Sequence, residues 1–364
     1  MKLMRIMSLL LTSAISVSLV MPALAQEQKP SPPSNAVEKA ERKTGPKVAA
    51  PLNLVGRFEF PSDVKGRFDH LIVEIQGHRL FTAAQGTKSV IAFDLRTHTL
   101  IHTISGIEIP HGFLYRDDLK RLYVTDGSPG SLRIYDGENY DLIKNVKLLP
   151  DTDPIAYDPD TKYLYIVNGG RDAKMNYSTI SIINTTSGET VGEMKVDSPG
   201  LDGMAIERSG RKLYVTNVAQ TKIEVLDRNT RTAIASWPIT LCKTNVALAV
   251  DESSRRLFVG CRSGQIVVFD TGTGKEIEAL PINQNIDDLA FDSASKRLYA
   301  TCGAGAGSVD VYQEEDPDHY KSLGQVPTGP GARTGRLVPE LKRFFVAVPQ
   351  HENTNAEVLE FKTQ

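Results

Sequence analysis

Arg121-Leu122-Tyr123-Val124-Thr125-Asp126 is one copy of a six-residue segment that recurs along this chain of 364 residues. Three other copies keep the pattern closely and three keep it loosely; they lie at 212–217, 256–261, 297–302, 79–84, 163–168 and 343–348. The second residue of the segment falls at positions 80, 122, 164, 213, 257, 298 and 344, so the interval stays between 41 and 49 residues. A period of this length, built from short β-prone segments, is typical of the blades of a β-propeller.

Each repeat predicts four strands. An apolar strand such as 203–206 precedes the signature segment, and an alternating strand that ends in Asp or Asn, such as 266–270, follows it. A more polar fourth strand, such as 142–146, is expected at the rim, with one face in water. Asp270 and Gly274 suit a tight turn, in which the carboxylate accepts hydrogen bonds from its own backbone and glycine takes a positive φ. The sequence therefore predicts an all-β fold, a seven-bladed β-propeller with four-stranded antiparallel blades.

The two ends of the repeat array complement each other. The last repeat stops after its third strand, at 356–361, and the segment 52–60 has the pattern of a lone fourth strand. We expect this N-terminal strand to complete the last blade, because ring closure removes exposed sheet edges. The predicted organisation is a signal peptide at 1–25, a disordered linker rich in proline and charge at 26–51, and the propeller at 52–364.

The N-terminal segment has the features of a secretory signal peptide. Lys2 and Arg5 precede an apolar stretch, and Ala23-Leu24-Ala25 offers small residues for cleavage after Ala25. A membrane anchor is the alternative, but the apolar run is shorter than the roughly 20 residues of a membrane-spanning helix. We therefore expect a periplasmic or secreted protein with no transmembrane anchor after cleavage.

The signature strands resemble the YVTN-type β-propeller repeat family, which includes the secreted YncE-like proteins. The segment Lys212-Leu213-Tyr214-Val215-Thr216-Asn217 is nearest to the family pattern, and the resemblance covers residues 52–364. It implies a seven-bladed propeller outside the cytoplasm. Similar propellers are lactonase-like hydrolases, heavy chains of amine dehydrogenases, or surface and binding proteins, so the resemblance does not select an activity.

Several classes of function lack their sequence signatures. No Cys-x-x-Cys-His segment for haem c occurs, and the single tryptophan, Trp237, does not fit a tryptophan-docked quinone propeller. No Gly-x-Ser-x-Gly elbow is present, and a net charge of −2 does not indicate a nucleic-acid-binding surface. The expected partner is a small ligand or an extracytoplasmic protein, and we expect a monomer.

The signature leucine provides a register for the residues that face the channel. The position eleven residues earlier is polar or charged in six of seven repeats: Asp69, His111, Asp153, Asp202, Val246, Asp287 and Arg333. His70 and Asp288 occupy the next position, and Arg336 lies slightly further along its own repeat. Since the innermost strands of a propeller line its channel, we predict a ligand-binding site at the channel mouth.

Two interpretations of this polar ring remain open. In one, the ring is structural, and Arg333 forms an ion pair with Asp69 across the blade closure. In the other, it binds a ligand: a divalent cation held by His70, His111 and Asp202, or a small anionic or carbonyl-bearing molecule held by Arg333 and Arg336. We predict a binding module with no assigned catalytic residue. The alternative is a lactonase-like hydrolase using a divalent cation in the mouth.

The three cysteines predict one disulfide. Cys242 and Cys261 should lie on the same face of the fold, which leaves Cys302 as a buried free thiol; the alternative, a thiol metal site, has no matching zinc spacing. Two longer loops, 169–177 and 349–355, should project from the mouth face. Five other histidines are expected on the surface: His78, His98, His102, His319 and His351.

Overall fold

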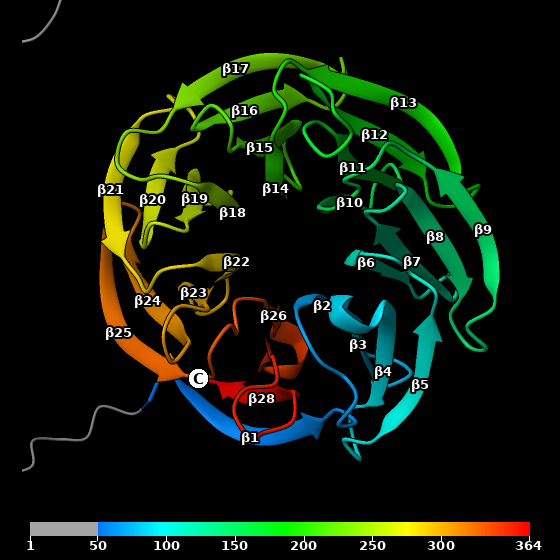
Figure 1. Cartoon of the computed structure of the whole chain (residues 1–364). Coiled ribbons are helices and arrows are strands. Elements are labelled where there is room, and N and C mark those ends of the chain that lie inside the picture. Colours follow the sequence, from blue (N-terminus) through cyan, green and yellow to red (C-terminus); the bar gives the residue numbers. More distant parts are fainter. Residues whose placement is uncertain (1–49) are drawn as a thin grey trace, which may run out of the picture. The chain divides into compact units, whose positions relative to one another are not determined.

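The computed structural model of the protein describes residues 50–364, so the predicted signal peptide and nearly all of the predicted linker lie outside the described residues. Residues 50–364 form seven four-stranded antiparallel sheets in a ring around a central opening (Figure 1). This confirms the predicted seven-bladed propeller. Helical structure in these residues consists of two 3-10 turns, η1 (Gln85–Thr87) and η2 (Pro339–Leu341). Within residues 50–364 there is no helix that is long and apolar enough to cross a membrane.

In blades one to six the four strands run in chain order from the channel to the rim. The first three blades are β2 (Phe68–Glu74), β3 (Arg79–Ala84), β4 (Ser89–Asp94) and β5 (Leu100–Ser105); β6 (Pro110–Arg116), β7 (Arg121–Asp126), β8 (Ser131–Asp136) and β9 (Leu142–Lys147); and β10 (Ile155–Asp158), β11 (Tyr163–Gly169), β12 (Ser178–Asn184) and β13 (Glu189–Val196). The next three are β14 (Leu201–Ile206), β15 (Lys212–Asn217), β16 (Lys222–Asp227) and β17 (Thr232–Pro238); β18 (Asn245–Asp251), β19 (Arg256–Cys261), β20 (Gln265–Asp270) and β21 (Glu276–Pro281); and β22 (Ile286–Asp292), β23 (Arg297–Cys302), β24 (Ser308–Asp316) and β25 (His319–Pro327).

Blade seven is assembled from both ends of the propeller. Its inner strands are β26 (Gly335–Val338), β27 (Arg343–Val348) and β28 (Glu357–Thr363), and its rim strand is β1 (Leu52–Glu59). β1 runs antiparallel to β28, with Leu52 opposite Thr363 and Glu59 opposite Glu357. The two strands lie side by side in Figure 1. The predicted closure by an N-terminal strand is confirmed.

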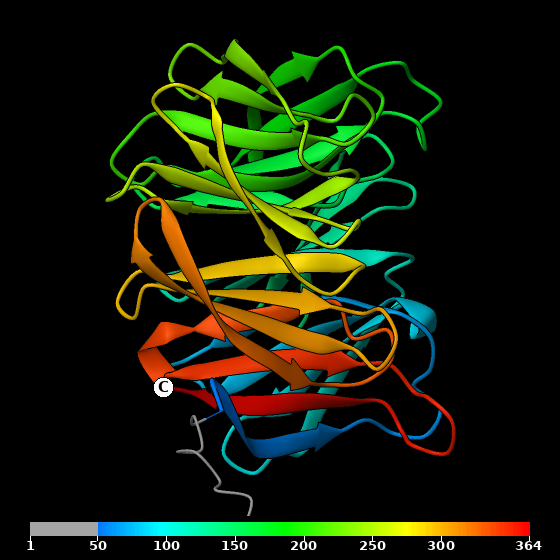
Figure 2. The same cartoon turned by 90° about the vertical axis from the view of Figure 1, so that its left-hand side faces the viewer.

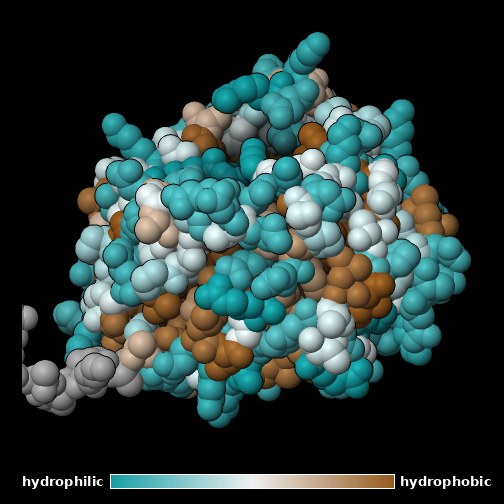
Figure 3. All heavy atoms as spheres, turned by 60° about the horizontal axis from the view of Figure 1, so that its bottom comes forward, coloured by the Kyte–Doolittle hydropathy of each residue, from teal (hydrophilic) through white to brown (hydrophobic). Residues whose placement is uncertain are grey.

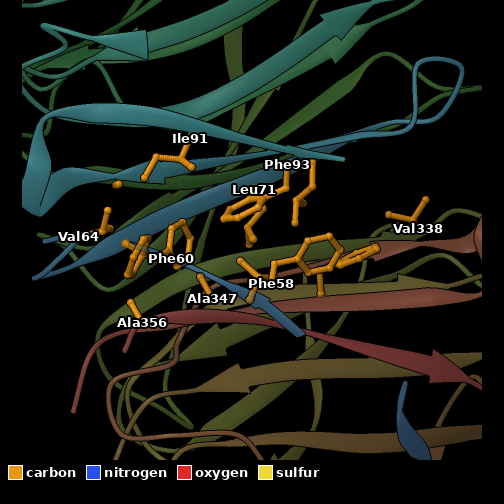
Figure 4. Packing of buried hydrophobic residues seen from close by; sticks show 14 residues of the cluster. Phe58, Phe60, Val64, Leu71, Ile91, Phe93, Val338, Ala347 and Ala356 are labelled. Carbon is orange, nitrogen blue, oxygen red and sulfur yellow. The ribbon is translucent and has the colours of Figure 1, made fainter. Parts of the chain in front are cut away.

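Buried aromatic side chains seal this closure (Figure 4). Phe58, on β1, is fully buried, and its ring centroid lies 5.6 Å from that of Phe93 in blade one and 6.2 Å from that of Phe345 in blade seven. His98 packs on Phe58 and lies 3.1 Å from Glu360, so this histidine, which was expected to be solvated, is only 32% exposed and contributes to the closure. The strand that closes the ring thus also packs blade seven against blade one.

The hydrophobic core is divided among the blade interfaces. Seven clusters of buried side chains occur, one between each pair of neighbouring blades. The signature strands are buried along nearly their whole length because neighbouring blades cover both faces, as the stacked sheets of Figure 2 show. Their third-position tyrosines are buried almost completely: Tyr123, Tyr165, Tyr214 and Tyr299.

The rim strands have the opposite character. In β5, β9 and β17 most residues are exposed, as expected for an outer strand with one face in water. The exposed residues include large apolar side chains, among them Leu100, Ile101, Leu142 and Ile143. Figure 3 shows such apolar areas scattered over a surface that is mostly hydrophilic.

The last residue of a signature strand anchors the segment that leads into the same blade. Asp126 is fully buried and accepts hydrogen bonds from the backbone N–H groups of Glu108 and Ile109, at 3.2 and 2.9 Å. In blade four, Ser198 donates a hydrogen bond to Asn217 at the same position. This position therefore fixes the start of the innermost strand, which carries the channel residues.

Candidate functional site

The seven innermost strands surround a cavity of about 260 Å³ at the mouth of the channel. The register predicted from the signature leucine is seen directly, since one residue per blade from the polar position lines this cavity: Asp69, His111, Asp153, Asp202, Val246, Asp287 and Arg333. His70, Asp288 and Arg336 line it as well. Deeper along the strands, apolar side chains contribute to the wall, including Leu71, Phe113 and Met204.

Backbone irregularities place these side chains at the channel. The pairing of the first strand with the signature strand shifts register between Phe68 and Leu71 in blade one and between Pro110 and Phe113 in blade two. The same shift occurs between Leu201 and Met204 in blade four, and blades five and six have related shifts. A bulge releases residues from the strand ladder and redirects their side chains. The ring residues of these blades lie within or beside such shifts.

Asp69 and His111, from blades one and two, form the tightest contact in the ring. His111 Nδ1 lies 2.5 Å from Asp69 Oδ2, and Gln85 Nε2 donates a hydrogen bond to the same oxygen at 2.7 Å. Burial opposes ionisation of Asp69, but the charges of His70 and His111 and the His111 hydrogen bond lower its pKa to about 2. Burial also disfavours the protonated form of His111, yet Asp153 and Asp69 raise its pKa to about 9. At neutral pH this is a carboxylate–imidazolium pair.

His70 reaches across the channel. Its Nδ1 lies 3.1 Å from Asp288 in blade six, and its Nε2 lies 4.0 Å from Asp153 in blade three. Because neither blade is a neighbour of blade one, these two contacts place the imidazole near the axis of the ring. Burial works against protonation, but Asp288 and Asp69 raise the pKa of His70 well above its usual value. The channel is therefore narrowed by a cationic side chain.

Asp287 is held by two arginines. Arg262 Nη2 lies 2.5 Å from one carboxylate oxygen of Asp287, and Arg333 Nε lies 3.1 Å from the other. The expected ion pair between Arg333 and Asp69 is thus replaced by a pair with the preceding blade, although the charge of Arg333 still helps to lower the pKa of Asp69. The side chain of Arg333 is long enough to reach Asp69 or Asp287. Asp69 already has His111 and Gln85 as hydrogen-bond partners, so Arg333 pairs with Asp287.

Asp153 and Asp202 are the carboxyl groups with the least support. Among residues 50–364, Asp202 has no hydrogen bond or ion pair, and the buried Oδ1 of Asp153 has no hydrogen-bond partner although His111 Nδ1 lies 3.3 Å away. Enclosure in the channel raises the pKa of Asp153 to about 6. Enclosure, together with the charges of Asp153 and Asp287, raises the pKa of Asp202 well above its usual value. Asp202 therefore keeps its proton to a higher pH than an ordinary aspartate and, when protonated, can donate a hydrogen bond to a ligand.

The donor atoms that lie close enough together to hold a metal ion belong to Asp69, His111 and Asp153. One atom from each lies within 4.8 Å of the others. Of the three ligands predicted from the sequence, His70, His111 and Asp202, only His111 belongs to this group. Two carboxylates and one imidazole suit a divalent cation chemically, but the proton on His111 would have to leave first, against its raised pKa.

Three polar residues at the channel escaped the sequence analysis. Arg67 comes just before β2, and the other two each follow a signature strand directly. Gln85 comes after β3 and bonds Asp69, while Arg262 comes after β19 and bonds Asp287. The other five blades carry small or apolar residues there: Gly127, Gly169, Val218, Gly303 and Pro349, with Gly169 closing β11 itself. A second register, set one residue beyond the signature segment, was the signal that would have found Gln85 and Arg262.

The cysteines and loops lie on the mouth face. Cys242 and Cys261 are joined by a disulfide, and Cys302 is a buried free thiol. The loop after β11 contacts the segment leading into blade four, where Arg171 donates a backbone hydrogen bond to Pro199. This loop therefore borders the mouth.

Comparison with known proteins supports the fold and leaves the family open. No protein-family model matches the chain, and no curated protein matches it. Among solved structures 1748 chains match, so the architecture is a common one. One is a chain in the crystal structure of the mitotic checkpoint complex, with a TM-score of 0.70, 12% identity, and coverage of 95% of this chain and 99% of that one. At this identity the match shows a shared fold alone.

Proposed function

We propose that this protein is an extracytoplasmic, YVTN-type β-propeller that binds a small polar ligand at the mouth of its channel without transforming it. The signal-peptide features of residues 1–25 and the signature strands support the location and the family. The observation that carries the binding function is the convergence of polar residues from all seven blades on one cavity of about 260 Å³. Concave sites with a few convergent polar groups are typical ligand sites.

The contacts inside the ring favour binding over a purely structural role. A structural ring would satisfy all its members, since an unpartnered enclosed polar group costs stability. Asp153 keeps one buried oxygen without a hydrogen bond, and Asp202, which is partly buried, has no side-chain partner among residues 50–364. These groups are available to a ligand.

A thermal-shift screen of the protein with organic acids, amines, sugars and divalent cations tests the proposal. We expect at least one compound to raise the melting temperature of the wild type and to lose this effect in Asp202→Asn. Asp141→Asn, an exposed substitution on an outer turn, is the matched control and should respond like the wild type. A ligand that stabilises Asp202→Asn and the wild type equally would place binding elsewhere, for example on the loops of the mouth face that would serve a protein partner.

The second candidate is a lactonase-like hydrolase that uses a divalent cation. The specific observation in its favour is the close grouping of Asp69, His111 and Asp153. A cation there would polarise a lactone carbonyl, and an aspartate of the ring outside this group, such as Asp202, would serve as the base. Metal analysis of the purified protein and a lactone panel separate the two functions. Hydrolysis that is abolished by chelation and by Asp153→Asn would replace binding with catalysis.

A further inference from the structure

We propose that the cavity takes a small organic anion held through Arg336, although aspartates outnumber every other charged residue around it. The proposal rests on the proposed binding function and names the chemical class of its ligand. It depends on which charged side chains of the cavity already have a partner within the protein.

Most of the aspartates are already neutralised. Four of the five have basic partners within the ring: Asp69 with His111, Asp153 with His111 and His70, Asp288 with His70, and Asp287 with both Arg262 and Arg333. Asp288 also accepts a hydrogen bond from the backbone N–H of Gly335 at 2.9 Å. The carboxylates that a cationic ligand would need are therefore largely occupied.

The arginines, in contrast to the aspartates, have more positive charge than their partners neutralise. Arg67 and Arg336 line the cavity and are exposed, and neither has an ion pair or a side-chain hydrogen bond among residues 50–364. Arg262 and Arg333 share a single carboxylate, so their two positive charges meet one negative charge. A guanidinium in a concave site attracts anions and binds carboxylate through two parallel hydrogen bonds.

The position of Arg336 indicates the shape of the ligand. Arg336, on β26, lies opposite Phe345 of β27. It is three residues beyond Arg333, which precedes β26, so the two backbone positions are at most about 10 Å apart at about 3.3 Å per residue. Asp202 lies at the level of Arg333 in the register of the ring. The innermost strands of blades four and seven stand on different sides of the opening in Figure 1. An elongated molecule with its anionic end at Arg336 and a second polar group at Asp202 would use both unpartnered groups.

The size of the cavity limits the ligand to a small metabolite. Its volume of about 260 Å³ lies just below the range of roughly 300–1,000 Å³ found for sites of drug-sized molecules. Apolar side chains such as Leu71 and Met204 form part of the wall and would contact a short carbon chain. An aliphatic acid with a carboxylate at one end and a polar group at the other fits this description.

Isothermal titration calorimetry with ligands of matched length tests the proposal. Glutarate, 5-aminovalerate and cadaverine share a five-carbon chain and differ in charge, and acetate, citrate and inorganic phosphate extend the set of anions. The full chain is measured as wild type, Arg336→Gln, Arg336→Lys and the control Arg96→Gln, which alters an exposed arginine on an outer turn. Unchanged melting temperatures verify that each variant is folded.

We expect at least one anion to bind, Arg336→Gln to weaken it tenfold or more, Arg336→Lys to recover part of the loss, and Arg96→Gln to have no effect. Equal binding by wild type and Arg336→Gln would overturn the proposal. Binding of cadaverine without any compound that carries a carboxylate or phosphate would overturn the charge assignment and leave the binding function standing. If none of these compounds binds, the anion proposal fails, and the binding function fails too if the thermal-shift screen is also negative.

Discussion

Cys242, in the segment that leads into blade five, is bonded to Cys261, the last residue of that blade's signature strand. In blade two the same position holds Asp126, which fixes the corresponding segment through two backbone hydrogen bonds. The disulfide in blade five therefore takes the role that the hydrogen bonds of Asp126 have in blade two. Both devices hold the start of an innermost strand and, with it, a residue of the channel wall.

We predict that Cys242→Ala lowers the free energy of unfolding by about 3 kcal/mol, because the disulfide closes a loop across a sequence separation of 19 residues. Urea denaturation of the oxidised protein measures the loss. A reducing agent should lower the stability of the wild type similarly and leave the variant unchanged. If the reducing agent destabilises both proteins equally, the disulfide is not the source.

Asp126→Ala should destabilise the protein by about 3–5 kcal/mol. The substitution removes the hydrogen-bond acceptor for the backbone N–H groups of Glu108 and Ile109. It also leaves the partly buried guanidinium of Arg133, which lies 2.8 Å from Asp126, without its ion-pair partner. Asp126→Asn keeps an acceptor oxygen and should cost less, as Asn217 at the same position of blade four suggests. Chemical denaturation compares the two, and equal losses would refute the anchoring role.

The pair formed by Asp69 and His111 predicts a pH window for stability. The pKa of His111 rises from 6.5 to about 9 on folding, so its contribution is complete below pH 6.5 and is lost as pH rises through 9. The pKa of Asp69 falls from 3.8 to about 2, so its contribution is present above pH 3.8 and is lost as pH falls through 2. The pair therefore stabilises most between about pH 4 and 6.5.

The shift of His111 corresponds to about 3 kcal/mol at most. Melting temperatures recorded from pH 5 to 10 should fall more steeply for the wild type than for His111→Gln. His102→Gln alters a histidine on the rim strand β5 and should follow the wild type. A His111→Gln profile parallel to that of the wild type would contradict the assignment.

Phe58→Ala should cost about 3–5 kcal/mol, since it opens a cavity among fully buried aromatic rings at the ring closure. Leu54→Ala lies on the same strand at a position that is 45% exposed, and it should change stability by less than about 0.5 kcal/mol. Urea midpoints of the two variants provide the comparison. A large loss in Leu54→Ala would mean that the rim face of β1 is covered in solution.

The sequence predicts the seven-bladed fold well because each sequence repeat corresponds to one four-stranded blade. The leucine register sets how far along its strand each residue lies, and this was enough to bring Asp69, Asp202 and Asp287 to one cavity. The register could not predict which partner each ring side chain contacts. Arg333 can reach Asp69 or Asp287, and the choice depends on which carboxylate is already occupied. His70 crosses the axis only because the channel is narrow, and channel width depends on how all seven blades pack.

Strand β1 is made first and its partner β28 last, and Arg57 and Glu357, which join them, lie 300 residues apart. The ring cannot close until β28, the last strand, has been synthesised. A product that lacks the last repeat would leave β1 without its partner β28 and would expose the apolar faces of blades one and six. We therefore expect the closure to act as a length check, because a chain that stops before β28 cannot complete blade seven.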